Sequence, residues 1–206
     1  MTELEFQALA RQGYNRIALI AETFSDLDTP LSVYLKLAHK PNSYLLESVV
    51  GGERFGRYSF IGLPARTAVR VRIGAPGEHL TQVLTDSKVV EEDRGDPLAF
   101  IENYLARFKT AVRPGLPRFC GGLAGYFGYD TVRLIEPGKL GATQKPDDLN
   151  LPDIHLLLTE ELAVIDNLTG RTYLIVYGDG THPEGYARAR ERLRELRAKL
   201  ARHIEP

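Results

Sequence analysis

The segment from Tyr44 to Gly62 constrains the fold most, because its pattern is typical of two strands joined by a tight turn. Apolar residues fill both arms of this segment. Between them, Gly51 and Gly52 permit the backbone to reverse with positive φ angles. The sequence therefore predicts an antiparallel hairpin here.

Polar side chains interrupt this hairpin at Glu47 and Ser48 on the first arm, and at Arg54, Arg57, Tyr58 and Ser59 on the second. A carboxylate, hydroxyl groups and two guanidinium groups are thus expected close to apolar side chains. That combination suits a small zwitterion with a bulky apolar side chain, because the acid faces its ammonium and the donors face its carboxylate. Pattern alone leaves a second interpretation open, namely a half-buried hairpin with a surface salt bridge between Glu47 and an arginine.

The remaining segments predict an α+β fold, in which antiparallel sheets pack with about four helices. Helical periodicity or helix-end signals mark residues 2–13, 29–38, 96–108 and 184–206. Strand patterns mark residues 16–24, 66–73, 154–166 and 171–177, with short edge strands expected at 80–84 and 88–92. No regular strand–helix–strand repeat runs along the chain, which argues against a doubly wound parallel sheet.

Residues that favour helix starts precede three of these helices. Thr2 with Glu5, and Thr181 with Glu184, have the spacing of a capping box, while Thr29 stands directly before a proline. The last helix carries an apolar stripe opposite a basic face, and we expect the stripe to pack on its own domain.

Charge and composition exclude several functions. Lys and Arg number 26 against 27 Asp and Glu, so no overall attraction to nucleic acid or to a membrane is expected. The single cysteine excludes an internal disulfide framework, and the five histidines are scattered without ligand spacing. We therefore expect a soluble, cytoplasmic protein with no metal site made by this chain alone.

A glycine-rich segment, FCGGLAGYFGYD, occupies residues 119–130. Its glycine spacing matches neither the dinucleotide fingerprint nor the phosphate loop. Close approach of backbone to backbone, or to another domain, explains the glycines better. Cys120 is expected to be a small core residue, since no histidine lies near it in the sequence.

Two stretches together resemble the N-terminal region of anthranilate synthase component I, the chorismate-utilising subunit of tryptophan biosynthesis. They are LLESVVGGERFGRYSFIG at residues 45–62 and FCGGLAGYFGYD at 119–130, followed by DLNLPDIHLLLTEELAVID. The resemblance extends over most of the 206 residues. It implies two sheets with outer helices, in a core shared between the N-terminal and C-terminal regions of the family.

The resemblance also implies a role for the hairpin. In this family, feedback inhibition acts through an L-tryptophan site, to which Leu46, Glu47 and Ser48 correspond, with Arg57 and Tyr58 expected from the second arm. Glu47 would balance the ammonium group of the effector or hold the strand pair, and Ser48 would hydrogen-bond near its amino-acid group. The parent enzyme is a lyase that makes anthranilate and pyruvate from chorismate with ammonia or glutamine.

Residues 1–206 are accordingly expected to form one N-terminal domain, with the helix at 184–206 leading to an absent chorismate-binding domain. The resemblance places Mg²⁺ and the catalytic residues in that absent domain, so this chain is expected to have no cofactor and no activity alone. A glutamine amidotransferase subunit is the other expected partner. Two alternatives remain: the N-terminal domain of aminodeoxychorismate synthase component I in the folate pathway, or a non-enzymatic module that binds a glutamine amidotransferase subunit.

Overall fold

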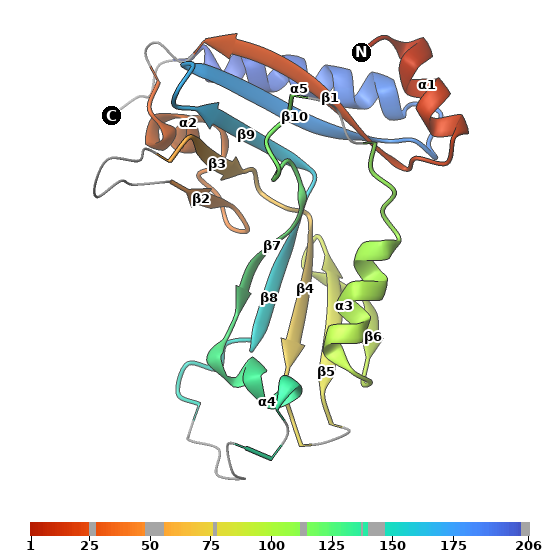
Figure 1. The fold of residues 1–206 in the computed structure, drawn as a ribbon, viewed down its shortest axis with the longest axis vertical. Coiled ribbons are helices and arrows are strands. Elements are labelled where there is room, and N and C mark those ends of the chain that lie inside the picture. The colour runs from red at the N-terminus through yellow and green to blue at the C-terminus, as the bar shows by residue number, and fades with distance from the viewer. Residues whose placement is uncertain are drawn as a thin grey trace. The chain divides into compact units, whose positions relative to one another are not determined.

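The computed structural model describes residues 1–24, 28–47, 56–75, 78–111, 115–136, 138–139 and 147–202. This part of the chain contains two antiparallel sheets of five strands each, five α-helices and one 3-10 helix (Figure 1). The α+β class predicted from the sequence is confirmed. None of the described helices is both long and apolar enough to cross a membrane.

The chain divides into two compact units. Unit 1 contains Met1–Ala65, Phe108–Gly122 and Thr159–Pro206, whereas unit 2 contains Arg66–Arg107 and Leu123–Leu158. The expectation of a single domain over residues 1–206 concerns the chain as a whole and stays a prediction.

Unit 1 is built on a sheet with the strand order β1-β10-β9-β3-β2 (Figure 1). Its elements are α1 (Glu3–Arg11), β1 (Arg16–Phe24), α2 (Pro30–Leu37), β2 (Tyr44–Leu46), β3 (Tyr58–Gly62), β9 (Glu161–Asp166), β10 (Arg171–Asp179) and α5 (Gly185–Leu200). Strands β2 and β3 pair antiparallel, with Tyr44 opposite Gly62 and Leu46 opposite Phe60. The described part of the expected hairpin is therefore confirmed, while its turn at Gly51 and Gly52 lies outside the described residues.

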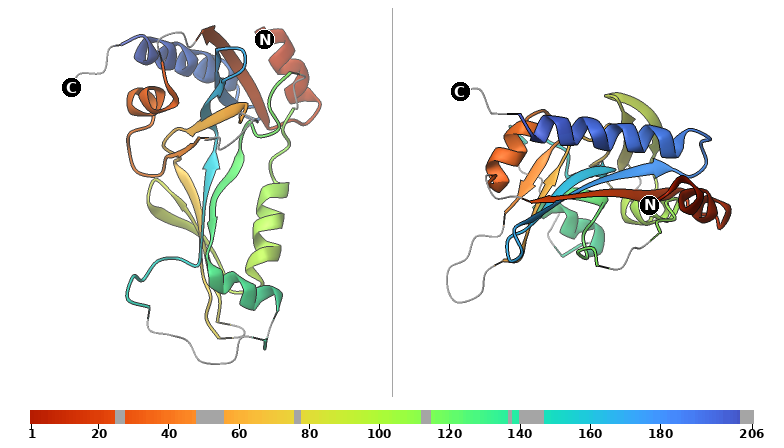
Figure 2. Two further views of the ribbon diagram at one scale, coloured as in Figure 1. Left: turned by 60° about the vertical axis from the view of Figure 1, so that its left-hand side comes forward. Right: turned by 90° about the horizontal axis from the view of Figure 1, so that it is seen from above.

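Three helices cover one face of the unit 1 sheet. Helix α5 lies along β10 and β1 (Figure 2), and its residues Ala189, Leu193 and Leu196 are buried there. The ring of Tyr186, at the start of α5, meets the ring of Phe6 from α1 at 5.7 Å between centroids. The apolar stripe of the last helix thus packs on its own unit, as predicted.

Helix caps agree with the sequence at α1 and α2 but not at α5. The Thr2–Glu5 capping box forms in both directions, and Thr29 caps α2. The box expected between Thr181 and Glu184 is wrong. Thr181 instead donates from both its backbone nitrogen and its hydroxyl to Asp179, at 2.8 and 2.6 Å. The backbone nitrogen of Glu184 donates to Nδ1 of His182 at 3.1 Å, so α5 begins at Gly185 without a side-chain cap.

Unit 2 has a sheet with the strand order β6-β5-β4-β8-β7. Its elements are β4 (Thr67–Arg72), β5 (Leu80–Thr85), β6 (Lys88–Asp93), α3 (Pro97–Ala106), β7 (Gly122–Phe127), η1 (Tyr129–Thr131), α4 (Val132–Ile135) and β8 (Ile154–Thr159). Helix α3 packs against β5. Asp96 caps this helix by accepting hydrogen bonds from the backbone of Leu98 and Ala99.

Two expectations about strands need correction. The single strand expected at residues 154–166 is two strands, since β8 pairs with β4 and β9 pairs with β3 and β10. The break falls at Glu160, whose carboxylate accepts a hydrogen bond from Arg16 at 2.8 Å. Strand β5 lies inside its sheet and not at an edge. The described residues form five α-helices, which agrees with the expected number of about four; the additional helix, α4, has only four residues and leaves no periodic pattern.

Close approach explains two glycines of the 119–130 segment, and at Gly125 it is an approach of backbone to backbone, as predicted. A Cβ atom at Gly125 would overlap the carbonyl oxygen of His155 in the neighbouring strand. Gly121 has a φ of +147°, and a Cβ atom there would lie 2.6 Å from the ring of Tyr177. Both positions therefore need a residue without a side chain.

Gly125→Ala should destabilise the protein by about 1–3 kcal/mol, because the added methyl group forces the backbone of β7 and β8 apart. Gly95→Ala is the matched control. A Cβ atom there would meet only the flexible carboxylate of Asp93, at 3.1 Å, so little change is expected. Urea unfolding of both variants checks this, and equal stability of the two would contradict the close approach.

Candidate functional site

The described ends of the hairpin, Tyr44–Glu47 and Gly56–Gly62, place the predicted site residues in unit 1. Side chains alternate across a strand, so Leu46, its partner Phe60 and Tyr58 share one face of the sheet. This is the face opposite α1, α2 and α5. Leu46 is 52% exposed on the edge strand β2, and Glu47 directly after it is also exposed.

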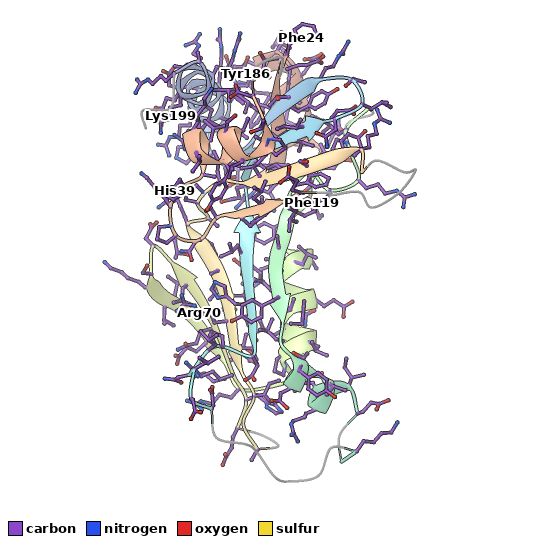
Figure 3. The ribbon with its side chains drawn as sticks, turned by 90° about the vertical axis from the view of Figure 1, so that its left-hand side faces the viewer. Phe24, His39, Arg70, Phe119, Tyr186 and Lys199 are labelled. Carbon is purple, nitrogen blue, oxygen red and sulfur yellow. The ribbon has the colours of Figure 1, made fainter. Side chains whose placement is uncertain are left out.

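Aromatic rings line this face beside Leu46. The rings of Tyr58 and Phe60 lie 6.1 Å apart. Phe119, labelled in Figure 3, comes from the segment before β7, and its ring meets that of Phe60 edge-on at 5.4 Å. The rings are only partly buried, so they offer an apolar surface of the kind that binds an aromatic or aliphatic side chain.

Arg57 is held by Asp166 from the far end of β9. Its Nε donates to both carboxylate oxygens at 3.2 Å, and its Nη2 donates to Oδ2 at 2.9 Å. The guanidinium group also lies over the ring of Tyr58, 4.9 Å from its centroid. The alternative interpretation was a salt bridge between Glu47 and an arginine. Among the described residues, Arg57 pairs with Asp166 and not with Glu47.

The two members of this ion pair differ strongly in exposure. The side chain of Asp166 is 2% exposed, whereas that of Arg57 is 51% exposed. Burial alone would raise the pKa of Asp166, but hydrogen bonds from Arg57 and from the backbone of Leu168 lower that pKa overall. The same pairing raises the pKa of Arg57 above its usual range. Both groups are therefore charged over the physiological pH range.

Of the five predicted effector residues, the structure describes Leu46, Glu47, Arg57 and Tyr58. Ser48 lies outside the described residues. Leu46, Arg57 and Tyr58 all belong to the same end of the β2–β3 hairpin, as the sequence predicts. These placements do not test their role in binding.

Sequence analysis missed Asp166 and Asn167. They stand at the start of the turn between β9 and β10, and Tyr58 lies opposite Asp166 in the β3–β9 ladder. The only local signal is an acidic residue that ends an apolar run. The pairing across more than a hundred residues leaves no trace in a local pattern.

Two largely buried tyrosines of unit 1 form hydrogen bonds within the fold. The hydroxyl of Tyr177 donates to the carbonyl oxygen of Cys120 at 2.8 Å, and burial raises the pKa of Tyr177. Burial likewise raises the pKa of Tyr44, whose hydroxyl bonds with that of Thr159 at 3.0 Å. Within the described ranges, no group of three or more His, Cys, Asp or Glu residues could hold a metal ion.

No protein-family model matches the chain. Among curated relatives, anthranilate synthase component 1 of Neisseria meningitidis is 55% identical over 202 residues, which is 97% of this chain and 40% of that protein. The same-named protein of Pseudomonas putida is 50% identical over 206 residues, covering 100% of this chain and 41% of that protein. The chain thus spans about two fifths of the length of these relatives, at their N-terminal end.

A solved structure gives the same picture of the fold. The crystal structure of anthranilate synthase component I from Streptococcus pneumoniae aligns with a TM-score of 0.54 at 22% identity. The alignment covers 88% of this chain and 37% of that one. At this identity the likeness concerns the fold alone.

The Arg57–Asp166 pair should make stability depend on pH. Because the pKa of Asp166 is lowered on folding, its contribution is fully present above the unfolded value of about 3.9 and is lost as the pH falls through the folded value. Asp166→Asn should therefore lower the thermal midpoint equally at pH 7 and pH 5, and by less below about pH 4. A midpoint difference that does not change with pH would contradict the ion pair.

Asp86→Asn is the control for this experiment. Asp86 forms a similar two-bond pair with Arg66, at 3.0 and 2.6 Å, but its side chain is 56% exposed. Solvent screens such a pair, so the loss should be smaller than for Asp166→Asn.

Proposed function

The chain is a relative of the N-terminal portion of anthranilate synthase component I over almost its whole length, and from this premise we propose that it carries that enzyme's L-tryptophan site. In this proposal the effector binds at the β2–β3 hairpin and inhibits the lyase reaction of the whole subunit. The whole subunit means the full-length protein of which we propose that this chain forms the N-terminal portion. The single observation that carries the proposal is a half-exposed guanidinium group fixed beside an aromatic surface.

The chemistry of a tryptophan molecule matches these groups. Arg57 offers directed donors to the carboxylate of the effector, since a guanidinium group pairs with a carboxylate through two parallel hydrogen bonds. Glu47 supplies the negative charge that balances the ammonium group. Leu46, Tyr58 and Phe60 supply apolar area for the indole ring, whose burial favours binding by about 25 cal/mol per Å² of apolar surface.

Ser48 completes the proposed set as a hydrogen-bond partner near the amino-acid group. Its place next to Glu47 in the sequence supports this role. Because strand β2 is an edge strand, polar backbone groups on its outer side are also open to a ligand.

Catalysis is proposed to belong to the rest of the whole subunit. The described residues contain no cluster suited to Mg²⁺, so no step of the reaction is assigned to them. A chorismate-binding domain and a glutamine amidotransferase subunit are the proposed partners. This chain then acts on the reaction through tryptophan occupancy, which requires that the effector bind the inhibited state more tightly than the active one.

In the whole subunit, Glu47→Gln and Ser48→Ala should each raise the tryptophan concentration for half inhibition by about tenfold, which corresponds to about 1.4 kcal/mol. The reason is that each substitution removes a protein group that is proposed to contact the effector, a charge at Glu47 and a hydrogen-bonding hydroxyl at Ser48. Anthranilate fluorescence measures the rate at increasing tryptophan concentrations.

Glu22→Gln is the matched control, since Glu22 is a carboxylate of the same sheet that pairs with Arg171. This substitution should leave the tryptophan concentration for half inhibition unchanged. A wild-type enzyme that tryptophan does not inhibit would refute the proposed function. Equal shifts in Glu22→Gln and Glu47→Gln would show that charge near the sheet, and not this site, sets the response.

A further inference from the structure

The turn between β9 and β10 holds the start of β3 through both side chains and backbone. Asn167 donates from its backbone to the carbonyl oxygen of Arg57 at 2.8 Å. Its side-chain amide donates to the carbonyl oxygen of Gly56 and to the hydroxyl of Ser59, each at 3.2 Å. Together with the bonds from Arg57 to Asp166, these contacts form what we call the Asp166 clamp.

The clamp fixes the orientation of the Arg57 guanidinium group and not merely its position. Two of its nitrogens, Nε and Nη2, face the carboxylate of Asp166. Asp166 is itself held from the other side, because the backbone nitrogen of Leu168 donates to Oδ1 at 3.1 Å. A planar group bound along one edge cannot rotate without losing several bonds, so its opposite edge points in a defined direction.

That opposite edge is available to a ligand. The Arg57 side chain is 51% exposed, and among the described residues its Nη1 has no hydrogen-bond partner. Tyr58 supports the guanidinium plane from one face at 4.9 Å. The clamp therefore presents N–H donors of fixed direction at the end of the aromatic surface formed by Tyr58 and Phe60.

We infer that Asp166 is a positioning residue that aims Arg57 at the carboxylate of the amino-acid effector and so makes the site select amino acids over their decarboxylated analogues. This inference rests on the proposed function. Asp166 already pairs with Arg57, so in this inference Arg57 contributes to binding through the direction of its donors more than through net charge. A lysine at position 57 keeps the charge but lacks the planar fork, so it should not replace arginine here.

The test compares inhibition of the whole subunit by L-tryptophan and by tryptamine, which has the indole ring and ammonium group but no carboxylate. The wild type should respond to tryptophan at a lower concentration than to tryptamine. Asp166→Asn and Arg57→Lys should each raise the half-inhibiting concentration of tryptophan about tenfold or more, with little change for tryptamine. The double variant should be no worse than either single variant, because both remove one interaction.

Asp86→Asn in unit 2 is the control, since it breaks an arginine–aspartate pair of similar geometry in the β5–β6 hairpin. It should leave both inhibition curves and the uninhibited rate unchanged. Arg57→Lys guards against misfolding of Asp166→Asn, because it leaves Asp166 and its bond from Leu168 in place. Circular dichroism establishes that each variant is folded at the assay temperature.

The outcomes separate the two claims. If tryptophan inhibits the wild type and both variants equally, the inference is wrong. If the half-inhibiting concentrations of tryptophan and of tryptamine rise by the same factor in the variants, Asp166 has only a structural role and the inference is also wrong. If tryptophan does not inhibit the wild type, the proposed function fails first and this inference fails with it.

Discussion

The antiparallel ladder between β9 and β3 is the constraint on which unit 1 depends. Strand β9 is paired on both sides, with β10 and β3, and its residues Leu162, Ala163 and Val164 are completely buried. This pairing joins the hairpin near residue 50 to a hairpin more than a hundred residues later. Since side chains alternate across a strand, a slip of one residue would exchange the helix-covered face for the aromatic face. The ladder therefore sets both the core and the direction of Tyr58.

Local signals predicted the elements well but not their partners. Caps at Thr2 and Thr29 formed as expected, because the atoms involved lie within three residues of each other. The 154–166 segment was predicted as one strand because β8 and β9 are both apolar and only Glu160 separates them. At Thr181 the prediction was wrong because His182 accepts the hydrogen bond from the backbone nitrogen of Glu184 on which the box depends. Strand order depends on contacts between distant residues, which no local pattern contains.

The same limit applies to the candidate site: its residues within one hairpin could be predicted, but its partner from a distant hairpin could not. The hairpin pattern identified Leu46, Arg57 and Tyr58 as neighbours, and the structure places them at one end of β2 and β3. The hairpin pattern could not identify Asp166, because only the register of β3 against β9 brings Asp166 opposite Tyr58. The consequence is functional as well as structural: the residue that orients the proposed binding group comes from a different hairpin than the group itself. A binding site whose donors are held in advance loses less conformational entropy when the ligand arrives.

The central claim is that an indole ring packs on the aromatic face beside β2. Methyl-labelled leucine in the whole subunit tests it most directly, because ring currents shift nearby methyl resonances during a titration with L-tryptophan. Leu46 lies on that face, whereas Leu4, which is 76% exposed on α1, serves as an internal reference. Binding of the indole ring on this face should give a saturable shift of the Leu46 methyl resonances and no shift for Leu4. Saturable inhibition without any shift at Leu46 would contradict it.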